Sequence, residues 1–529
     1  MANISFANLK KSFVMWRDEI DNHVTQKSPD TFYTNTASHH YVTLHGTNLE
    51  YQNGVPSGGH VDSLDINLGT EIMLGGAVAP ADIEITGIDA DFIDYAEMIS
   101  TPTPIDRTMA MWAATLAGDD IFEFGEGTAR NVTVNIAGDG YEAPADRVGG
   151  NDWFVGDNFE GSVIGDFMSI GRGRTASGGD DHMRATESAG TNFVGDINAS
   201  LAGSRFIGGD DMIALDRHAY ATGDAGEGQG ELVAGNDTIT GGDENDQLVG
   251  DVNYAGATSS IRYGDDLIHG GDGDDYIAGD YGLSVSTNFT GGEDTLYGDG
   301  GNDTIDGGPG ADVIRGGTGN DSMIGSTGVD TANYSDKTKA VDIRLDGGGG
   351  ALVNVDGVVE DRIDQFENII GGTAGDRLFG SADIIDNVFA GRAGNDTLNG
   401  GGGRDTLIGG TGKDKLVGGA GRDEFRFEAK LITSNVDKIA DFTRGTDKIA
   451  LDDAIFKALG ATFDKSEFVA LKTGHAAGNS ARHVIYDKAH GSLWYDADGK
   501  GGHAAVQFAQ LGTTGEHPAT LAWHDFAIV

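Results

Sequence analysis

Aspartates recur at a fixed spacing in two stretches of this 529-residue sequence, and their carboxylates are the groups best able to do chemistry. Each follows a glycine-rich turn and stands two positions before an apolar residue. The first series is Asp294, Asp303, Asp312, Asp321 and Asp330, and the second is Asp396, Asp405, Asp414 and Asp423. Carboxylates and the bare carbonyls of glycine turns are hard oxygen donors, which Ca²⁺ prefers. The spacing therefore predicts calcium sites.

The glycines of these turns complete the predicted sites. Ca²⁺ takes about six to eight oxygen ligands, and one turn offers fewer, so we expect each ion to be shared between turns two nonapeptides apart. The expected pairs are Asp294 with Asp312, Asp303 with Asp321, Asp312 with Asp330, Asp396 with Asp414, and Asp405 with Asp423. The glycines counted among the metal-binding residues are Gly291, Gly301, Gly308, Gly310, Gly317, Gly319, Gly401, Gly403, Gly410, Gly412, Gly419 and Gly421.

The short period also indicates the fold. A strand of the form x-apolar-x buries one side chain, so a repeat forms a core only by stacking on its neighbours. The pattern G-G-x-G-x-D-x-U-x resembles the calcium-binding nonapeptide of the repeats-in-toxin (RTX) family. The resemblance implies an all-β chain with a parallel β-roll or β-solenoid, several Ca²⁺ ions, and a secreted, extracellular protein that can associate with the cell surface.

A longer and less regular period precedes the nonapeptides. Gly-x-Asp turns recur there at intervals of 26 to 32 residues, and a second Gly-Asp stands about half-way between them. We interpret each interval as one coil with a surface-loop excursion of about eleven residues. The candidate metal ligands of this region are Asp152, Asp181, Asp211, Asp237, Asp246, Asp266 and Asp275, and Asp376 joins the second nonapeptide block. The half-way aspartates are Asp139, Asp166, Asp196, Asp224, Asp251 and Asp280. Six aromatic residues of these coils are expected to fill the core, namely Trp153, Phe154, Phe159, Phe167, Phe193 and Phe206.

The predicted coils are flanked and interrupted by other segments. Apolar residues at steps of three and four predict an amphipathic helix over 1–30, and apolar–polar alternation predicts a β-sandwich-like domain over 31–105. The long repeats then occupy 106–290, the first nonapeptides 291–335, a hairpin spacer 336–370, and the second nonapeptides 371–428. Residues 429–529 resemble the C-terminal capping and secretion domain of RTX proteins, with the export address at Asp525–Val529. That resemblance implies the type I secretion apparatus as a partner.

Composition excludes several classes of protein. Lysine and arginine number 35 against 84 aspartates and glutamates, which gives a net charge of −49. Nucleic acid is therefore excluded as a partner, because phosphate binding needs clustered cations. Cysteine is absent, so neither disulfides nor thiolate metal sites exist. No apolar run approaches the ~18 residues of a transmembrane helix, and we find no N-terminal secretory signal peptide. We expect calcium to drive folding, because stacked carboxylates repel one another without it.

No catalytic motif accompanies the repeats. H-E-x-x-H and G-x-S-x-G are both missing, which disfavours a zinc protease and a lipase. We therefore expect a non-enzymatic protein of the cell surface or matrix that serves assembly, adhesion or exopolysaccharide binding. The alternative is a secreted polysaccharide-active enzyme on the solenoid face, with Arg172, Arg174 or Arg184 assisting uronate chemistry.

Overall fold

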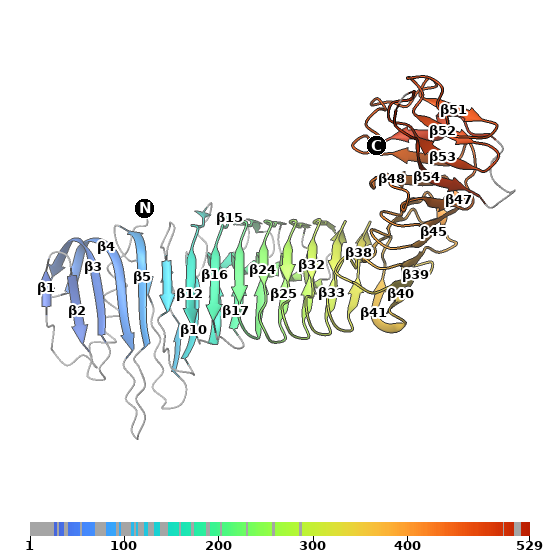
Figure 1. The fold of residues 1–529 in the computed structure, drawn as a ribbon. Coiled ribbons are helices and arrows are strands. Elements are labelled where there is room, and N and C mark those ends of the chain that lie inside the picture. The colour runs from blue at the N-terminus through green and yellow to red at the C-terminus, as the bar shows by residue number, and fades with distance from the viewer. Residues whose placement is uncertain are drawn as a thin grey trace. The chain divides into compact units, whose positions relative to one another are not determined.

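The computed structural model describes residues 149–529 except 158–159, 171–173, 187–190, 201–203, 229–230, 256–259, 285–287, 501 and 513–519. Before residue 149 it describes only the strands β1 to β11. The described residues are mostly strands and turns, with one 3₁₀-helix, η1 (Trp523–Asp525), and none of their helices could span a membrane. The chain forms two compact units, Met1–Gly310 and Ala311–Val529 (Figure 1).

The N-terminal strands form an antiparallel series that leads into the solenoid. These strands are β1 (Gln26–Ser28), β2 (Thr31–Asn35), β3 (Tyr41–Gln52), β4 (Val55–Leu68), β5 (Ala81–Ala90) and β9 (Ile121–Phe124). Each pairs with the next in antiparallel fashion, and β9 then pairs in parallel with the first long coil. These strands thus make one continuous sheet, in which β5 pairs with β9. The β-sandwich-like domain over 31–105 stays a prediction. The predicted helix over 1–30 cannot be compared with the structure as a whole, because the only described residues in that range are those of the strand β1.

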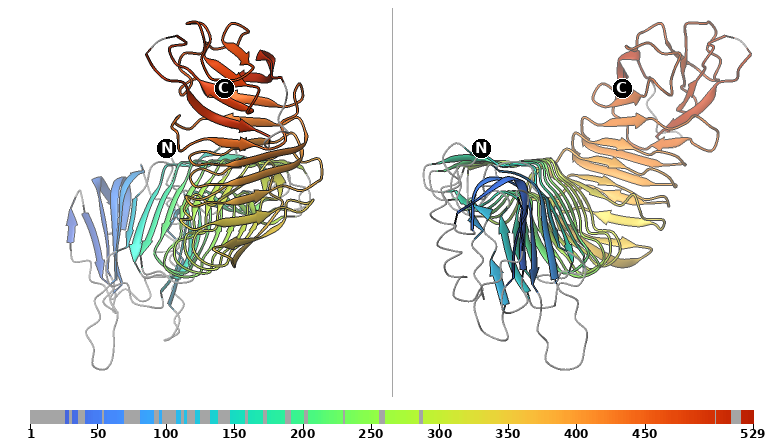
Figure 2. Two further views of the ribbon diagram at one scale, coloured as in Figure 1. Left: turned by 45° about the vertical axis from the view of Figure 1, so that its right-hand side comes forward. Right: turned by 90° about the vertical axis from the view of Figure 1, so that its left-hand side faces the viewer.

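Four short strands build each coil of the long-repeat region. Sheet I contains β12 (Trp153–Asp157), β16 (His182–Thr186), β20 (Met212–Leu215), β24 (Thr238–Thr240), β28 (Leu267–His269) and β32 (Thr295–Tyr297). Sheet II contains β7 (Arg107–Ala110), β10 (Val132–Ala137), β13 (Glu160–Ile164), β17 (Thr191–Val194), β21 (Ala219–Thr222), β25 (Gln247–Val249), β29 (Tyr276–Ala278) and β33 (Thr304–Asp306). Both sheets are parallel. Figure 2 shows the coils stacked one behind another.

The excursions between these coils are strands, not the surface loops that we predicted. Sheet III contains β14 (Phe167–Ile170), β18 (Ile197–Ser200), β22 (Ala225–Gly228), β26 (Val252–Ala255) and β30 (Tyr281–Ser284). Sheet IV contains β11 (Arg147–Val148), β15 (Thr175–Ser177), β19 (Arg205–Ile207), β23 (Glu231–Val233), β27 (Ser260–Arg262) and β31 (Asn288–Thr290). Ile197, Phe206, Leu232, Val252 and Ile261 are buried together between the two sheets. Each strand buries so few side chains that its sequence alone resembles a loop.

The C-terminal unit continues with two parallel stacks. Sheet V contains β35 (Val313–Arg315), β38 (Thr331–Asn333), β42 (Asn368–Ile370), β44 (Val388–Ala390), β46 (Thr406–Ile408), β48 (Glu424–Phe427), β50 (Lys448–Leu451) and β55 (Phe526–Ile528). Sheet VI contains β36 (Ser322–Ile324), β43 (Arg377–Phe379), β45 (Thr397–Gly403), β47 (Lys415–Gly421), β49 (Asp437–Ile439) and β54 (Val506–Leu511). Most of the nonapeptide strands bury one apolar side chain, such as Leu398 or Leu407, whereas β50 near the end of the stack buries three residues.

The spacer and the C-terminal segment join the same sheets. The spacer forms β39 (Val341–Arg344), β40 (Ala351–Val355) and β41 (Val358–Asp364), and β41 pairs in parallel with β36. Beyond β50 the chain adds β51 (Phe468–Leu471), β52 (Val484–Asp487) and β53 (Ser492–Tyr495) before β54. Two-residue strands complete the set, namely β6 (Tyr95–Ala96), β8 (Ala113–Ala114), β34 (Pro309–Gly310) and β37 (Thr327–Gly328).

The aromatic residues of the long coils divide between core and surface. Phe154, Phe193 and Phe206 are buried, as expected of core fillers. Trp153 is 45% exposed, so its predicted core role is wrong: it follows Asp152 directly and therefore points out of sheet I. Phe159 and the side chain of Phe167 lie outside the described residues.

Candidate metal centre

Backbone conformation explains the glycines of the regular turns. The second and fourth positions adopt positive φ, for example 90° at Gly410 and 146° at Gly412, a region where only glycine is unstrained. The same conformation occurs at Gly301, Gly308, Gly317, Gly319, Gly401, Gly403, Gly419 and Gly421. The other two predicted glycines, Gly291 and Gly310, lack it. Glycine at these positions therefore lets the turn form without backbone strain.

The aspartates of stacked turns are linked through the backbone at the predicted spacing. The Asp396 N–H donates to Oδ1 of Asp414 at 2.8 Å, and the Asp405 N–H donates to Oδ1 of Asp423 at 3.1 Å. Asp312 and Asp330 are joined in the same way at 2.9 Å. These are three of the five pairs that we expect to share an ion. Each link fixes one carboxylate oxygen and leaves the other to face the turn.

The remaining oxygens form a cradle that suits a cation. Oδ2 of Asp396, of Asp405 and of Asp414 is buried without a hydrogen-bond partner. A Cβ atom built on Gly391 would lie 2.4 Å from Asp396 Oδ2 and 2.8 Å from the Gly409 carbonyl oxygen. A carboxylate and a carbonyl from successive turns therefore point at one place, which glycine leaves open. This donor set fits Ca²⁺, whose ligands are oxygens.

Five further residues extend these rows, and sequence spacing missed them. Asp361 accepts from the Asp321 N–H, Glu367 from Asp330, Asp437 from Asp414, and Asp447 from Asp423, while Asn387 donates to Asp405. Asp376, which was predicted, accepts from the Val341 N–H and donates to Asp396. All five missed residues stand two positions before a buried apolar residue. That signal survives where an insertion breaks the nine-residue count.

In the long coils the predicted aspartates occupy two kinds of turn. Asp246 and Asp275 lie between sheets I and II, where the Asp246 N–H donates to Asp275 and the Asp275 N–H to Asp303. The others lie between sheets IV and I and form a second linked row, comprising Asp152, Asp181, Asp211, Asp237, Asp266 and Asp294. Of the half-way aspartates, Asp139 lies outside the described residues. The other five lie between sheets II and III and meet this second row, namely Asp166, Asp196, Asp224, Asp251 and Asp280.

Burial disfavours the ionised form of these carboxylates unless a positive charge lies close to them. Burial raises the pKa of Asp396 and of Asp437 to about 8, and the pKa of Asp275 and of Asp405 to about 7. In each case the neighbouring aspartates raise it further, because like charges disfavour ionisation. A bound divalent cation reverses this effect and keeps the carboxylates ionised.

Comparison with known proteins agrees with this geometry. The model of the RTX calcium-binding nonapeptide repeat (4 copies) matches residues 233–252, 262–282, 290–323, 297–332 and 387–425. The chain carries RTX calcium-binding repeats. These repeats bind several calcium ions and indicate a secreted, calcium-binding protein, and the matched description names no catalytic activity.

Solved structures and curated proteins add little to the RTX match. One similar structure is that of the extracellular lipase LipA from Serratia marcescens, at 17% identity and a TM-score of 0.18. That similarity covers 55% of this chain and 40% of the lipase chain, so the chain spans less than half of the lipase's length. None of the curated proteins compared with this sequence matches it.

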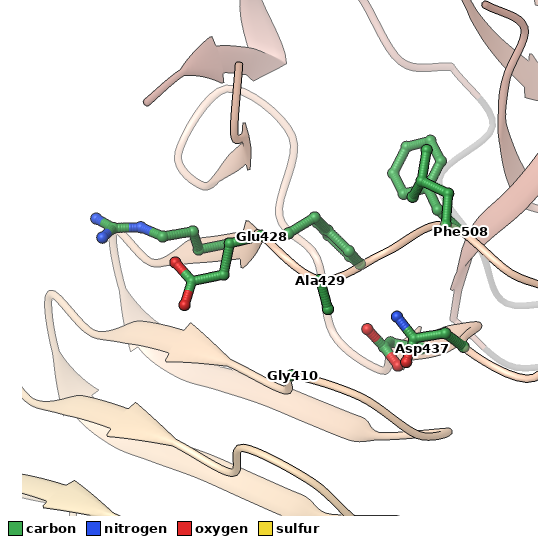
Figure 3. Close-up of a pocket in the computed structure, with 9 residues that line it drawn as sticks. Gly410, Glu428, Ala429, Asp437 and Phe508 are labelled. Carbon is green, nitrogen blue, oxygen red and sulfur yellow. The ribbon is translucent and has the colours of Figure 1, made fainter. Parts of the chain in front are cut away.

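A small pocket lies in the C-terminal unit. It is lined by Gly410, Arg426, Phe427, Glu428, Ala429, Leu431, Asn435, Asp437 and Phe508. Its two carboxylates, on Glu428 and Asp437, lie on opposite sides in Figure 3. Asp437 accepts the Asp414 N–H and so belongs to the aspartate row described above.

Proposed function

We propose that this secreted calcium-binding protein has a non-enzymatic role at the cell surface or in the matrix, and that it binds exopolysaccharide on sheet I. The outer face of sheet I supports this proposal. Strand register aligns Trp153, His182 and Met212 in one outward row. The Trp153 and His182 rings stack with centroids 3.9 Å apart, and His269 stacks on Tyr297 at 4.4 Å.

Such a face has the form that a sugar polymer needs. Parallel strands repeat about every 4.8 Å, so the two ring pairs stand on a regularly spaced sheet along which an extended chain can lie. Aromatic rings present apolar area together with polar edges, as sugar rings do. The net charge of −49 repels anionic polymers. We therefore infer a neutral polysaccharide as the ligand.

The enzymatic alternative has less support. It needs accessible carboxylate pairs on the long coils, whereas Asp152, Asp181 and Asp211 are at most 3% exposed. Their oxygens accept hydrogen bonds from neighbouring backbone or face one another in the interior. Of the three arginines considered for uronate chemistry, Arg174 and Arg184 are exposed and Arg172 lies outside the described residues. A polymer on the surface cannot reach the aspartates.

Affinity electrophoresis of the calcium-loaded protein in gels containing dextran or another neutral glucan tests the proposal. We expect the gel to retard the wild-type protein and the double variant W153A/H269A to lose that retardation. W523A is the matched control, because Trp523 is exposed to a similar extent, 41% against 45%, in the C-terminal unit. Equal retardation of all three proteins would refute the proposal, and shortening of the glucan would favour the enzyme.

A further inference from the structure

In each long coil, two turns that are far apart in the sequence come close together. The turn from sheet II to sheet III there meets the turn from sheet IV to sheet I, so a large lobe and a small lobe share a neck. Figure 1 shows β15 of the small lobe along one edge of the stack formed by β16 and β17. Eleven aspartates line this neck row, namely Asp152, Asp166, Asp181, Asp196, Asp211, Asp224, Asp237, Asp251, Asp266, Asp280 and Asp294.

The neck carboxylates gather in groups of three. The triads are Asp152–Asp166–Asp181, Asp181–Asp196–Asp211 and Asp224–Asp237–Asp251, and in each the contributing oxygens lie within 4.8 Å of one another. All of these side chains are at most 3% exposed. Three ionised carboxylates at such separations are strongly unfavourable in a dry interior, and near neutral pH a bound cation can neutralise them.

The backbone holds these carboxylates in place by one oxygen each. Oδ1 of Asp181 accepts the Asp152 N–H at 2.6 Å, and Oδ2 of Asp166 accepts the Gly179 N–H at 2.8 Å. Oδ2 of Asp196 accepts the Gly209 N–H at 2.9 Å. One oxygen of each carboxylate is thereby fixed beside the neck.

The second oxygens supply an independent indication of a ligand. Oδ2 of Asp181, Oδ1 of Asp196 and Oδ2 of Asp211 are buried and have no hydrogen-bond partner. A Cβ atom built on Gly165 would lie 1.6 Å from Asp181 Oδ2 and 1.8 Å from the Gly195 carbonyl oxygen. The same arrangement recurs one coil later at Gly195, with Asp211 Oδ2 at 1.7 Å. Carboxylate and carbonyl oxygens thus converge coil after coil.

We infer that the neck row is a file of interior calcium sites, a second class beside the nonapeptide turns. The donors are carboxylate and carbonyl oxygens, which suit Ca²⁺ and not a metal that needs nitrogen or sulfur ligands. Asp166 and Asp196 come from the turn between sheets II and III, and both lie outside the segments that match the nonapeptide model. Each ion ties the small lobe to the large one, independently of any glycan on sheet I.

Calcium content tests the inference in the full-length protein. After gel filtration in buffered calcium near neutral pH, we expect D166N/D196N to hold two fewer calcium ions per chain than the wild type, because those residues serve two triads. The matched control is D180N/D210N, which makes the same charge change at exposed positions one residue before Asp181 and Asp211. The control should keep the wild-type content. A folded D166N/D196N with an undiminished calcium count would overturn the inference.

A second measurement avoids the chance that the double variant does not fold. Crystals of the wild-type protein grown in calcium are expected to give anomalous difference peaks between the paired turns of the neck. Peaks confined to the nonapeptide turns, with none along the neck, would show that the neck carboxylates bind no cation. That outcome would leave the glycan proposal intact.

Discussion

Single residues determine where the backbone can turn, and the nonapeptide glycines show this most directly. The backbone at Gly410 has a φ of 90°, which is strained for any residue with a side chain. A Cβ atom built there would lie 2.0 Å from the Arg392 carbonyl oxygen. Ten of the twelve glycines that the repeat pattern indicates have positive φ, because the turn needs a residue without a side chain at those positions. The pattern fails at Asp299, Ser326 and Arg392, which have positive φ without being glycine.

Substitution at Gly410 should therefore weaken both the turn and its calcium site. We expect G410A to lower the free energy of unfolding by about 1–3 kcal/mol and to raise the calcium concentration at the folding midpoint. Far-UV circular dichroism during a calcium titration measures both effects. G460A is the control, since a Cβ there would meet only the Thr462 carbonyl oxygen, at 3.9 Å. Equal midpoints for the two variants would contradict the argument.

The missed ligands at the residue scale have a physical cause. Asp361, Asp437 and Asp447 occupy the same position in the stack as the repeat aspartates, yet insertions separate them from their partners by 40, 23 and 24 residues. Stacking constrains where a residue lies in the coil and not how many residues intervene. A count of nine therefore finds the regular rows and loses their continuations.

Short strands were the hardest elements to predict. Sequence patterning identified the nonapeptide strands, because their apolar positions recur in phase. It also indicated the β39–β40 hairpin, because apolar and polar residues alternate there. It failed for sheets III and IV, whose strands often bury only one side chain. In β19, for example, Phe206 is buried between the half-buried Arg205 and Ile207. Only pairing with equivalent strands in the adjacent coils makes such a segment a strand.

Removal of the Phe206 side chain tests whether sheets III and IV form a packed lobe or a set of loops. It is 1% exposed and belongs to the apolar cluster between sheets III and IV. We expect F206A to destabilise the calcium-loaded protein by about 3–5 kcal/mol, as large-to-small core changes do. Phe289, 38% exposed on β31, provides the control F289A, which should have a much smaller effect. Thermal unfolding in excess calcium compares them, and a negligible shift for F206A would restore the loop interpretation.

At the scale of the whole molecule, acid and calcium are alternative ways to neutralise the aspartate rows. Burial raises the pKa of Asp396 to about 8 and of Asp405 to about 7, above the ~3.9 of an unfolded aspartate. Protonation of these groups therefore favours the folded state. That contribution is complete below about pH 4 and is lost as pH rises through about 7 to 8.

Calcium-free protein should accordingly keep more β-structure at about pH 5.5 than at about pH 8.5. Added calcium should restore the fold at the higher pH, because the ion replaces the protons. Far-UV circular dichroism in EDTA measures the difference, with gel filtration to exclude aggregation near the isoelectric point of about 4.3. Identical spectra at both pH values in EDTA would contradict this reasoning.

The segment Asp525–Val529, where we predict the export address, is itself part of the folded C-terminal unit. Its strand β55 pairs with β50 through Ile449 and Phe526, and Asp525 is fully buried beside Arg444 at 3.5 Å. Since β50 follows the last calcium turns, loss of calcium should release this segment together with the stack beneath it. We expect the amide protons of residues 526–528 to exchange slowly in calcium and rapidly in EDTA, as followed by hydrogen–deuterium exchange. Protection that persists in EDTA would mean that the segment folds without calcium, and the calcium-free state would then not expose it for export.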